Sequence, residues 1–343
     1  MKIQRLMLAV LAVCGTSAAL AQSSVSIYGR LNTSIERQKI GDQSTTGMFN
    51  NASRIGFKGV EDLGGGLKAG FQLEAGFGSD DGSGPLNFKR QSELNLSGNF
   101  GMLRLGRWTA ESNYAVADYG VLDEPNHDTG FFSDQLYSYL MRDDNKIAYR
   151  TPVLGGFTLE GAMSFHEKAD GINATGPYAN KNAYDVAANW ESGPLALGAG
   201  YTKLGDAKQY GLRAHYTIGD FQIGGYYQRS DNVGFDSGIT GTGGFGALGD
   251  FGKRNLFRLT GGYTFGASQI AVGYGHAGNI GGRDDTGASQ FILGYNYNLS
   301  KRTKVYAAYT KINNKDNATY GGVGTAGAGK NASSFGVGVR HNF

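Results

Sequence analysis

Apolar and polar residues alternate strictly in the last stretch of the chain, SSFGVGVRHNF. Phe335, Val337, Val339 and Phe343 share one parity, and small or polar residues fill most of the positions between them. Successive side chains of a β-strand point to opposite faces, so this segment presents one apolar face and one small or polar face. A strand with its apolar face outward is typical of a sheet that faces lipid.

The same alternation recurs from one end of the chain to the other. In the first segment, residues 24–36, Val25 and Ile27 oppose Ser26 and Tyr28. Glycine-rich stretches such as EDLGGG separate consecutive segments, as expected for hairpins. The pattern continues with strands near residues 54–58, 68–77, 88–97, 101–108, 145–152, 156–166, 182–192, 195–204, 208–218, 221–230, 254–265, 268–276, 288–299, 303–313 and 332–343. Most are close to the roughly 9 to 11 residues that a tilted strand needs to cross a bilayer.

The connections between these segments also alternate. Short turns near residues 154, 192, 218, 265 and 299 are interleaved with longer segments rich in glycine, aspartate and asparagine, which is the outer-membrane arrangement. An open sheet edge in hydrocarbon would leave unpaired backbone groups, each costing a few kcal/mol. The pattern therefore predicts an all-β fold, a closed 16-stranded antiparallel transmembrane β-barrel that forms a single domain over residues 22–343.

The N-terminal segment predicts export. Lys2 and Arg5 precede a short apolar run, and Ala19 and Ala21 form an A-x-A site, so we expect a signal peptide at residues 1–21. The apolar run is far shorter than the roughly 20 residues of a spanning helix, and no later segment supplies one. The single cysteine, Cys14, lies within this leader, so the mature chain is expected to have no disulfide.

Composition narrows the function classes. Loss of the two basic leader residues takes the formal net charge from +3 to +1, which argues against a nucleic-acid partner. Glycine is abundant, with 57 residues, whereas proline is scarce, with 5. Glycine without proline suits closely approaching strands and tight turns better than disorder.

Six blocks of sequence resemble one family. They are SVSIYGR at 24, SRIGFKGVEDLGGGLKAGFQLE at 53, GNFGMLRLGR at 98, NKIAYRTPVLGGFTL at 145, NLSKRTKVYAAYTKIN at 298 and FGVGVRHNF at 335. Together they are similar to the trimeric general-diffusion porins of Gram-negative bacteria, particularly the neisserial and β-proteobacterial branch. The likeness runs over the whole mature chain.

The resemblance implies a homotrimer in the cell outer membrane. Each barrel would hold a water-filled pore for passive diffusion of small hydrophilic solutes and ions, without a cofactor. It would contact outer-membrane lipid and lipopolysaccharide and be inserted by the outer-membrane assembly machinery. A third external loop would fold inward, and residues 109–141, the longest interval without strand alternation, are the candidate.

The resemblance also implies a constriction in which basic wall residues face acidic residues of that loop. The basic candidates are Arg30, Arg54, Arg90 and Arg142, and the acidic candidates are Asp118, Asp123 and Glu124. Opposed charges across a narrow aqueous slot would set the potential that ions meet. The segment LDEPN stands where the family often has Pro-Glu-Phe-Gly, so the identity of the acidic pair stays open.

Alternation tests part of this assignment independently. It points Arg30 and Arg54 into the lumen. It does not do so for Arg90, which shares the parity of Leu94, so either a bulge intervenes or Lys89 is the inward residue. Other residues with lumen parity are Lys58, Lys68, Glu74, Glu160, Asp185, Arg213, His215 and Arg258. The final Phe343 resembles the signal that the assembly machinery reads.

Two other function classes compete with a pore. An outer-membrane barrel enzyme needs a nucleophile, a base and an orienting group, but the five histidines are scattered, with no G-x-S-x-G motif. Histidine and cysteine also lack the spacing of metal ligands. An adhesin with a plugged barrel needs bulky inward residues, whereas the inward rows here are small, polar or charged. The sequence favours an open channel.

Overall fold

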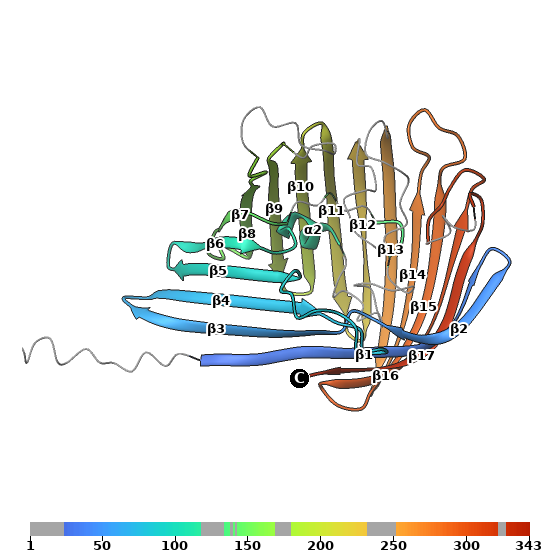
Figure 1. The fold of residues 1–343 in the computed structure, drawn as a ribbon, viewed down its shortest axis with the longest axis horizontal. Helices are drawn as coiled ribbons and strands as arrows, with labels where there is room; N and C mark the ends of the chain where they lie inside the picture. Colours follow the sequence, from blue (N-terminus) through green and yellow to red (C-terminus); the bar gives the residue numbers. More distant parts are fainter. Residues whose placement is uncertain are drawn as a thin grey trace, which may run out of the picture.

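The computed structural model describes residues 24–117, 134–137, 140, 143–168, 180–231, 252–321 and 327–343. Within them one antiparallel sheet holds seventeen strands (Figure 1). The strands are β1 (Ser24–Ile40), β2 (Gln43–Asn50), β3 (Arg54–Gly64), β4 (Leu67–Gly76), β5 (Gln91–Gly98), β6 (Gly101–Arg107), β7 (Lys146–Arg150), β8 (Phe157–Ser164), β9 (Ala183–Ser192), β10 (Leu195–Leu204), β11 (Ala207–Ile218), β12 (Phe221–Asp231), β13 (Lys253–Phe265), β14 (Ser268–Ala277), β15 (Ala288–Asn298), β16 (Thr303–Asn314) and β17 (Ala332–Asn342). A short helix, α2 (Glu111–Val116), follows β6.

The sheet closes on itself. From β3 onward each strand pairs with the next along the chain, and β17 pairs back onto β1. Strands β2 and β3 pair with successive halves of β1, so together they form one wall strand that is interrupted at residues 51–53. The wall therefore has sixteen strands, and the predicted closed antiparallel barrel is confirmed.

The first hairpin differs from the sequence-based expectation. Strand β1 continues to Ile40 instead of ending near residue 36, and β2 was not predicted at all. The segment QSTTGMFN lacks a regular apolar row, so its side chains carry little strand signal. Its eight residues pair with β1 through the backbone, with Asn50 opposite Thr33 at one end and Gln43 opposite Ile40 at the other. Backbone pairing of this kind does not depend on side-chain polarity.

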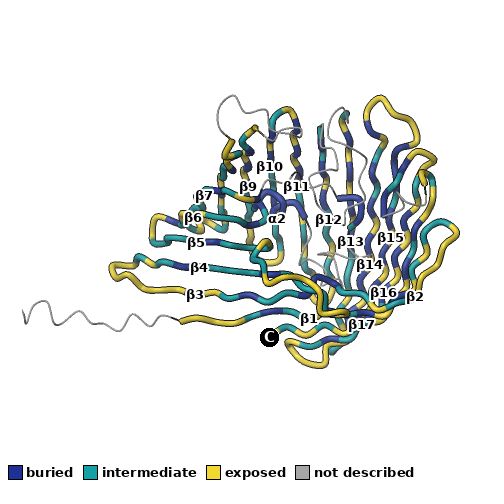
Figure 2. Tube along the Cα trace, in the orientation of Figure 1, coloured by how far each residue is buried: buried dark blue, intermediate teal, exposed yellow. Residues whose placement is uncertain are grey.

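Burial along the strands is the reverse of that in a soluble sheet. In β17 the apolar side chains of Phe335 and Val337 are 55% and 49% exposed, whereas Ser334 is 1% exposed. Inward polar residues of β1, such as Asn32 and Glu36, are equally buried. Figure 2 shows the resulting alternation of exposed and buried positions along the strands. The outer face is therefore apolar and suited to lipid, and the inner face is polar.

The C-terminal residue completes the seam between β17 and β1. The Gly29 N–H donates to the Phe343 carbonyl at 3.0 Å, and the Phe343 N–H donates to the Gly29 carbonyl at 3.1 Å. A Cβ atom at Gly29 would lie 2.4 Å from Cζ of Phe343, so the phenyl ring occupies the space that a side chain would need. Among the described residues, no helix combines the length and apolar character needed to cross a membrane.

Candidate channel constriction

Three arginines and one glutamate lie close together on the inner wall of β1, β3 and β4. Arg30 of β1 stands directly opposite Arg54 of β3 in the strand register. The Glu74 carboxylate on β4 lies 3.8 Å from the Arg54 guanidinium and accepts a 2.7 Å hydrogen bond from Nε of Arg90. Arg30, Arg54, Glu74 and Arg90 are called the arginine cluster below. Counted over these four groups, its formal charge is positive, with three guanidinium groups and one carboxylate.

Arg90 reaches this cluster because it precedes the strand. Strand β5 begins at Gln91, and Arg90 lies in the bend before it, so the parity of Leu94 does not decide where its side chain points. The Arg90 N–H still donates to the Glu74 carbonyl at 3.2 Å. Lys89, the alternative inward residue, is exposed. Strand alternation fails here because it holds only inside regular strands.

Neighbouring side chains fix the orientation of the Glu74 carboxylate. The Tyr28 hydroxyl donates to its Oε2 at 3.0 Å, and Nε2 of Gln72 donates to the Tyr28 oxygen at 2.7 Å. The ammonium group of Lys58 lies 5.3 Å from the centre of the Tyr28 ring. Both carboxylate oxygens of Glu74 are therefore engaged, which holds the arginine cluster in one geometry.

Helix α2 lies at the start of the interval 109–141 and contacts the inner face of β9, β10 and β11 (Figure 1). The hydroxyls of Ser112 and Thr202 are 2.8 Å apart. At the other end of the helix, the Arg213 guanidinium donates to the Ala117 carbonyl at 3.3 Å. Asn189 of β9 donates to the Glu111 carboxylate at 3.3 Å. Contacts from three strands therefore hold α2 on the wall.

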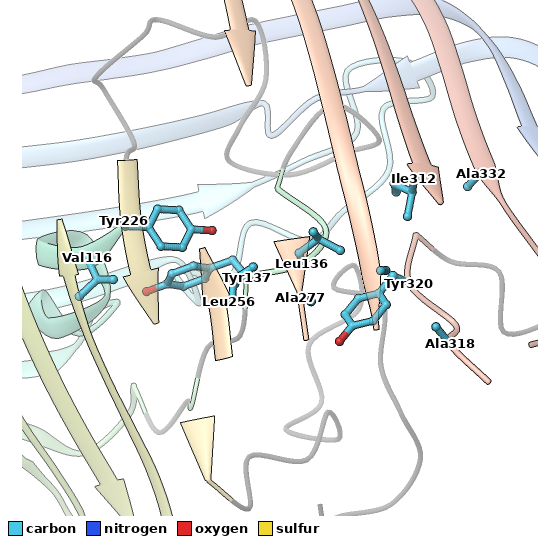
Figure 3. Close-up of a cluster of buried hydrophobic side chains, with 12 residues drawn as sticks. Val116, Leu136, Tyr137, Tyr226, Leu256, Ala277, Ile312, Ala318, Tyr320 and Ala332 are labelled. Atoms are coloured by element: carbon cyan, nitrogen blue, oxygen red, sulfur yellow. The ribbon is translucent and has the colours of Figure 1, made fainter. Parts of the chain in front are cut away.

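Residues 134–137 of the same interval contact β12 to β15. Asp134 forms a 3.3 Å ion pair with Arg258 and accepts a hydrogen bond from the Tyr226 hydroxyl. The Leu136 carbonyl accepts from Arg254 at 3.1 Å. Figure 3 shows Leu136 and Tyr137 within a cluster of buried apolar side chains of the wall that includes Tyr226 and Leu256. The described parts of the interval therefore pack on the half of the ring opposite the arginine cluster.

A second charge network joins β5, β6, β7 and β8, and of its members only Glu160 is predicted from the sequence to face the lumen. The Arg104 guanidinium donates to Glu93 at 2.7 Å and to Glu160 at 2.8 Å. Arg150 donates to the same Glu160 at 2.8 Å and also pairs with Glu111 of α2. Alternation places Arg104 and Arg150 inward, since their neighbours Leu105 and Tyr149 are exposed, but it cannot show which carboxylates they meet.

A buried lysine joins the two ends of the interval. Lys146 donates to the Trp108 carbonyl at 3.2 Å, and its ammonium group lies 3.5 Å from the Asp143 carboxylate and 3.8 Å from that of Asp185. The Trp108 N–H donates to the Asp143 carbonyl at 3.2 Å. The Arg104 guanidinium lies 4.3 Å from the centre of the Trp108 ring. These contacts fix where the interval leaves the wall and where it returns.

The remaining predicted site residues lie outside the described residues. They are Arg142 of the basic set and Asp118, Asp123 and Glu124 of the acidic set. The structure therefore does not test their roles, and the same holds for the signal peptide at residues 1–21. Over the part of the chain that the structure describes, no group of three or more histidine, cysteine, aspartate or glutamate residues is arranged to hold a metal ion.

Comparison with known proteins supports one family. A family model described as Gram-negative porin matches residues 8–317. Outer membrane porin protein 32 of Delftia acidovorans is 34% identical, and the alignment covers 100% of both chains. The major outer membrane protein P.IB of Neisseria meningitidis serogroup B is 27% identical over 96% of this chain and 98% of its own.

Solved structures agree with the sequence relatives. The anion-selective porin from Comamonas acidovorans matches with a TM-score of 0.74 and 29% identity, covering 94% of this chain and 100% of that one. The OmpF of Salmonella typhi shares the fold, with a TM-score of 0.69 at 15% identity. With the closed barrel, its apolar outer face and its charged inner wall already described, these matches show that the chain belongs to the Gram-negative porin family.

Proposed function

We propose that this outer-membrane diffusion channel is narrowest between the arginine cluster and the interval 109–141, and that it prefers anions. The observation that carries the proposal is the arginine cluster itself, in which Arg54 and Arg90 contact the Glu74 carboxylate on the inner wall and Arg30 stands opposite Arg54 in the strand register. A positive group beside a narrow aqueous path raises the local concentration of anions. A structural relative that is 29% identical is described as anion-selective.

The interval 109–141 forms the opposite side of this constriction. Its described parts, α2 and residues 134–137, contact β9 to β15, and the arginine cluster belongs to the other half of the ring. On this proposal Asp118, Asp123 and Glu124 line the interval where it faces the cluster, and Arg142 adds to the basic side. The acids then create a field across the path instead of neutralising the cluster.

Membership of the family supports a proposal for the oligomer and for the route to the membrane. We propose a homotrimer in which every barrel conducts separately, exported by a signal peptide at residues 1–21 and inserted by the assembly machinery that reads Phe343. The family and its named relatives point to a channel rather than an enzyme. Solutes then cross by diffusion alone, without chemistry on the wall.

Reconstitution in a planar bilayer tests this function. Purified protein should insert with stepwise conductance that closes in thirds, because each barrel of a trimer conducts separately. With a salt gradient across the bilayer, the reversal potential should have the sign of anion preference. Stepwise conductance with a cation-selective potential would refute the role of the arginine cluster, and absence of conductance from folded trimer would refute the channel itself.

A further inference from the structure

Helix α2 packs against three glycines of the barrel wall. Gly198 and Gly200 of β10 and Gly211 of β11 belong to the inner face, since their strand neighbours Leu197 and Leu212 are exposed on the outer face. Gly198, Gly200 and Gly211 are called the glycine patch below. Glycine inside a strand costs roughly 0.5–1 kcal/mol relative to alanine, so a patch of three calls for a packing reason.

The helix occupies the space that side chains would fill at these positions. A Cβ atom at Gly198 would lie 1.8 Å from the Ala115 carbonyl oxygen, and one at Gly200 would lie 2.2 Å from the Ser112 carbonyl oxygen. At Gly211 it would lie 2.6 Å from Cγ1 of Val116. Non-bonded carbon atoms are most stable about 3.5–4.0 Å apart. Two of the three obstacles are backbone atoms, so relief requires the whole helix to move.

Contacts at both ends keep α2 from sliding along the wall. Glu111 at its first turn pairs with Arg150 of β7. At its C-terminal end, Arg213 donates to the Ala117 carbonyl at 3.3 Å and to the Tyr114 carbonyl at 3.4 Å. Because the two ends are held, a side chain on the patch would displace the helix away from the wall, toward the interior of the barrel.

We infer that the glycine patch sets how far α2 stands out from the wall and thereby sets the width of the channel beside it. Because these three positions have no side chains, α2 lies close against β10 and β11. The part of the barrel cross-section that α2 does not fill stays open to solutes. This inference rests on the proposed function, since it takes the interval as the constricting segment. It assigns Gly198, Gly200 and Gly211 a role in conductance although none of them carries a polar group.

The test compares Gly200→Ala with Gly261→Ala. An added methyl group at position 200 must move α2 by about 1.3 Å to restore normal contact with the Ser112 carbonyl, so we expect the single-channel conductance to fall roughly 1.2-fold or more. Gly261 on β13 faces outward, where a Cβ would meet Cγ2 of Val272 at an ordinary 3.6 Å. Gly261→Ala should leave conductance unchanged. Equal conductance of Gly200→Ala and the parent, both folded, would overturn the inference.

A cross-link reports the position of α2 independently of any conductance measurement. Ser112→Cys and Thr202→Cys replace two hydroxyls that are 2.8 Å apart, and Cys14, the single native cysteine, lies in the predicted leader. The pair should form a disulfide readily in the parent barrel and more slowly once Gly200→Ala is added. Equal rates would show that the patch does not position the helix. A parent that cross-links but never conducts would refute the proposed function and leave the placement of α2 intact.

Discussion

At the scale of single residues, the electrostatic potential at the inner wall depends on which charged side chains lie next to one another. Glu74 receives hydrogen bonds from Tyr28 and Arg90 and lies within ion-pair distance of Arg54. Its negative charge is thus shared, and the arginine cluster as a whole is positive. A cluster of this kind sets a local potential because the wall beside it has a low dielectric constant.

Reversal of one charge in the arginine cluster should change ion selectivity. Arg54→Glu converts three positive and one negative groups into two of each, so we expect the reversal potential in a salt gradient to move toward cation preference. Arg37→Glu makes the same charge change on the exposed outer row of β1 and serves as the control. If both variants kept the parental reversal potential, Arg54 would lie outside the constriction.

Arg104 is a stability determinant rather than a selectivity determinant. Its guanidinium is enclosed by the carboxylates of Glu93 and Glu160, which are 5% and 1% exposed at the side chain. Arg104→Leu leaves the buried Glu93 carboxylate without its cation and leaves Glu160 with Arg150 alone, and we expect a loss of roughly 3–5 kcal/mol in the free energy of unfolding. This loss is measured by urea titration, in which the folded fraction is followed by its mobility in a gel. Adding Glu93→Gln and Glu160→Gln should recover most of the loss, and a barrel insensitive to Arg104→Leu would contradict the argument.

At the scale of elements, the seam between β1 and β17 depends on the last residue. Phe343 exchanges two backbone hydrogen bonds with Gly29 and covers it with its ring. The ring lies at the wall and not at the arginine cluster, so its contribution belongs to closure of the barrel. Assembly and conduction should therefore separate experimentally at this residue.

Deletion of Phe343 should impair insertion more than conductance. The variant loses the last pair of the β1–β17 ladder, so we expect less folded protein in the outer-membrane fraction, while the channels that do form conduct as the parent does. The measurements are the folded fraction by gel mobility and single-channel conductance. Phe343→Tyr keeps the ring and should assemble normally. Normal assembly of the deletion variant would show that Phe343 is not an assembly signal.

Strand alternation located nearly every wall strand, and its two failures have one physical cause. Strand β2 carries too few apolar side chains to show a period, and Arg90 lies in a bend where the period does not apply. In both places the backbone is held by hydrogen bonds to a neighbouring strand, β1 in the case of β2 and Glu74 of β4 in the case of Arg90. Sequence periodicity reports side-chain environment and not pairing partners.

At the scale of the whole molecule, closure of the ring creates the channel. Sixteen wall strands bring the arginine cluster of β1, β3 and β4 to one half of the ring and the contacts of α2 and residues 134–137 to the other half. Groups more than a hundred residues apart, such as Leu136 and Arg254, meet only because the ring is closed. The proposed field across the channel is thus a property of the barrel and not of any single strand.

The sequence by itself determined that the chain is a lipid-facing barrel, because a membrane imposes an apolar residue at every second position and this constraint is local. It also determined that Arg30 and Arg54 point inward. Only the tertiary structure decided that Arg90 joins them at Glu74, that Arg104 lies between Glu93 and Glu160, and that α2 rests on Gly198, Gly200 and Gly211. Those contacts join residues of different elements, and their partners are fixed by strand register and ring closure, which no local pattern of polarity records.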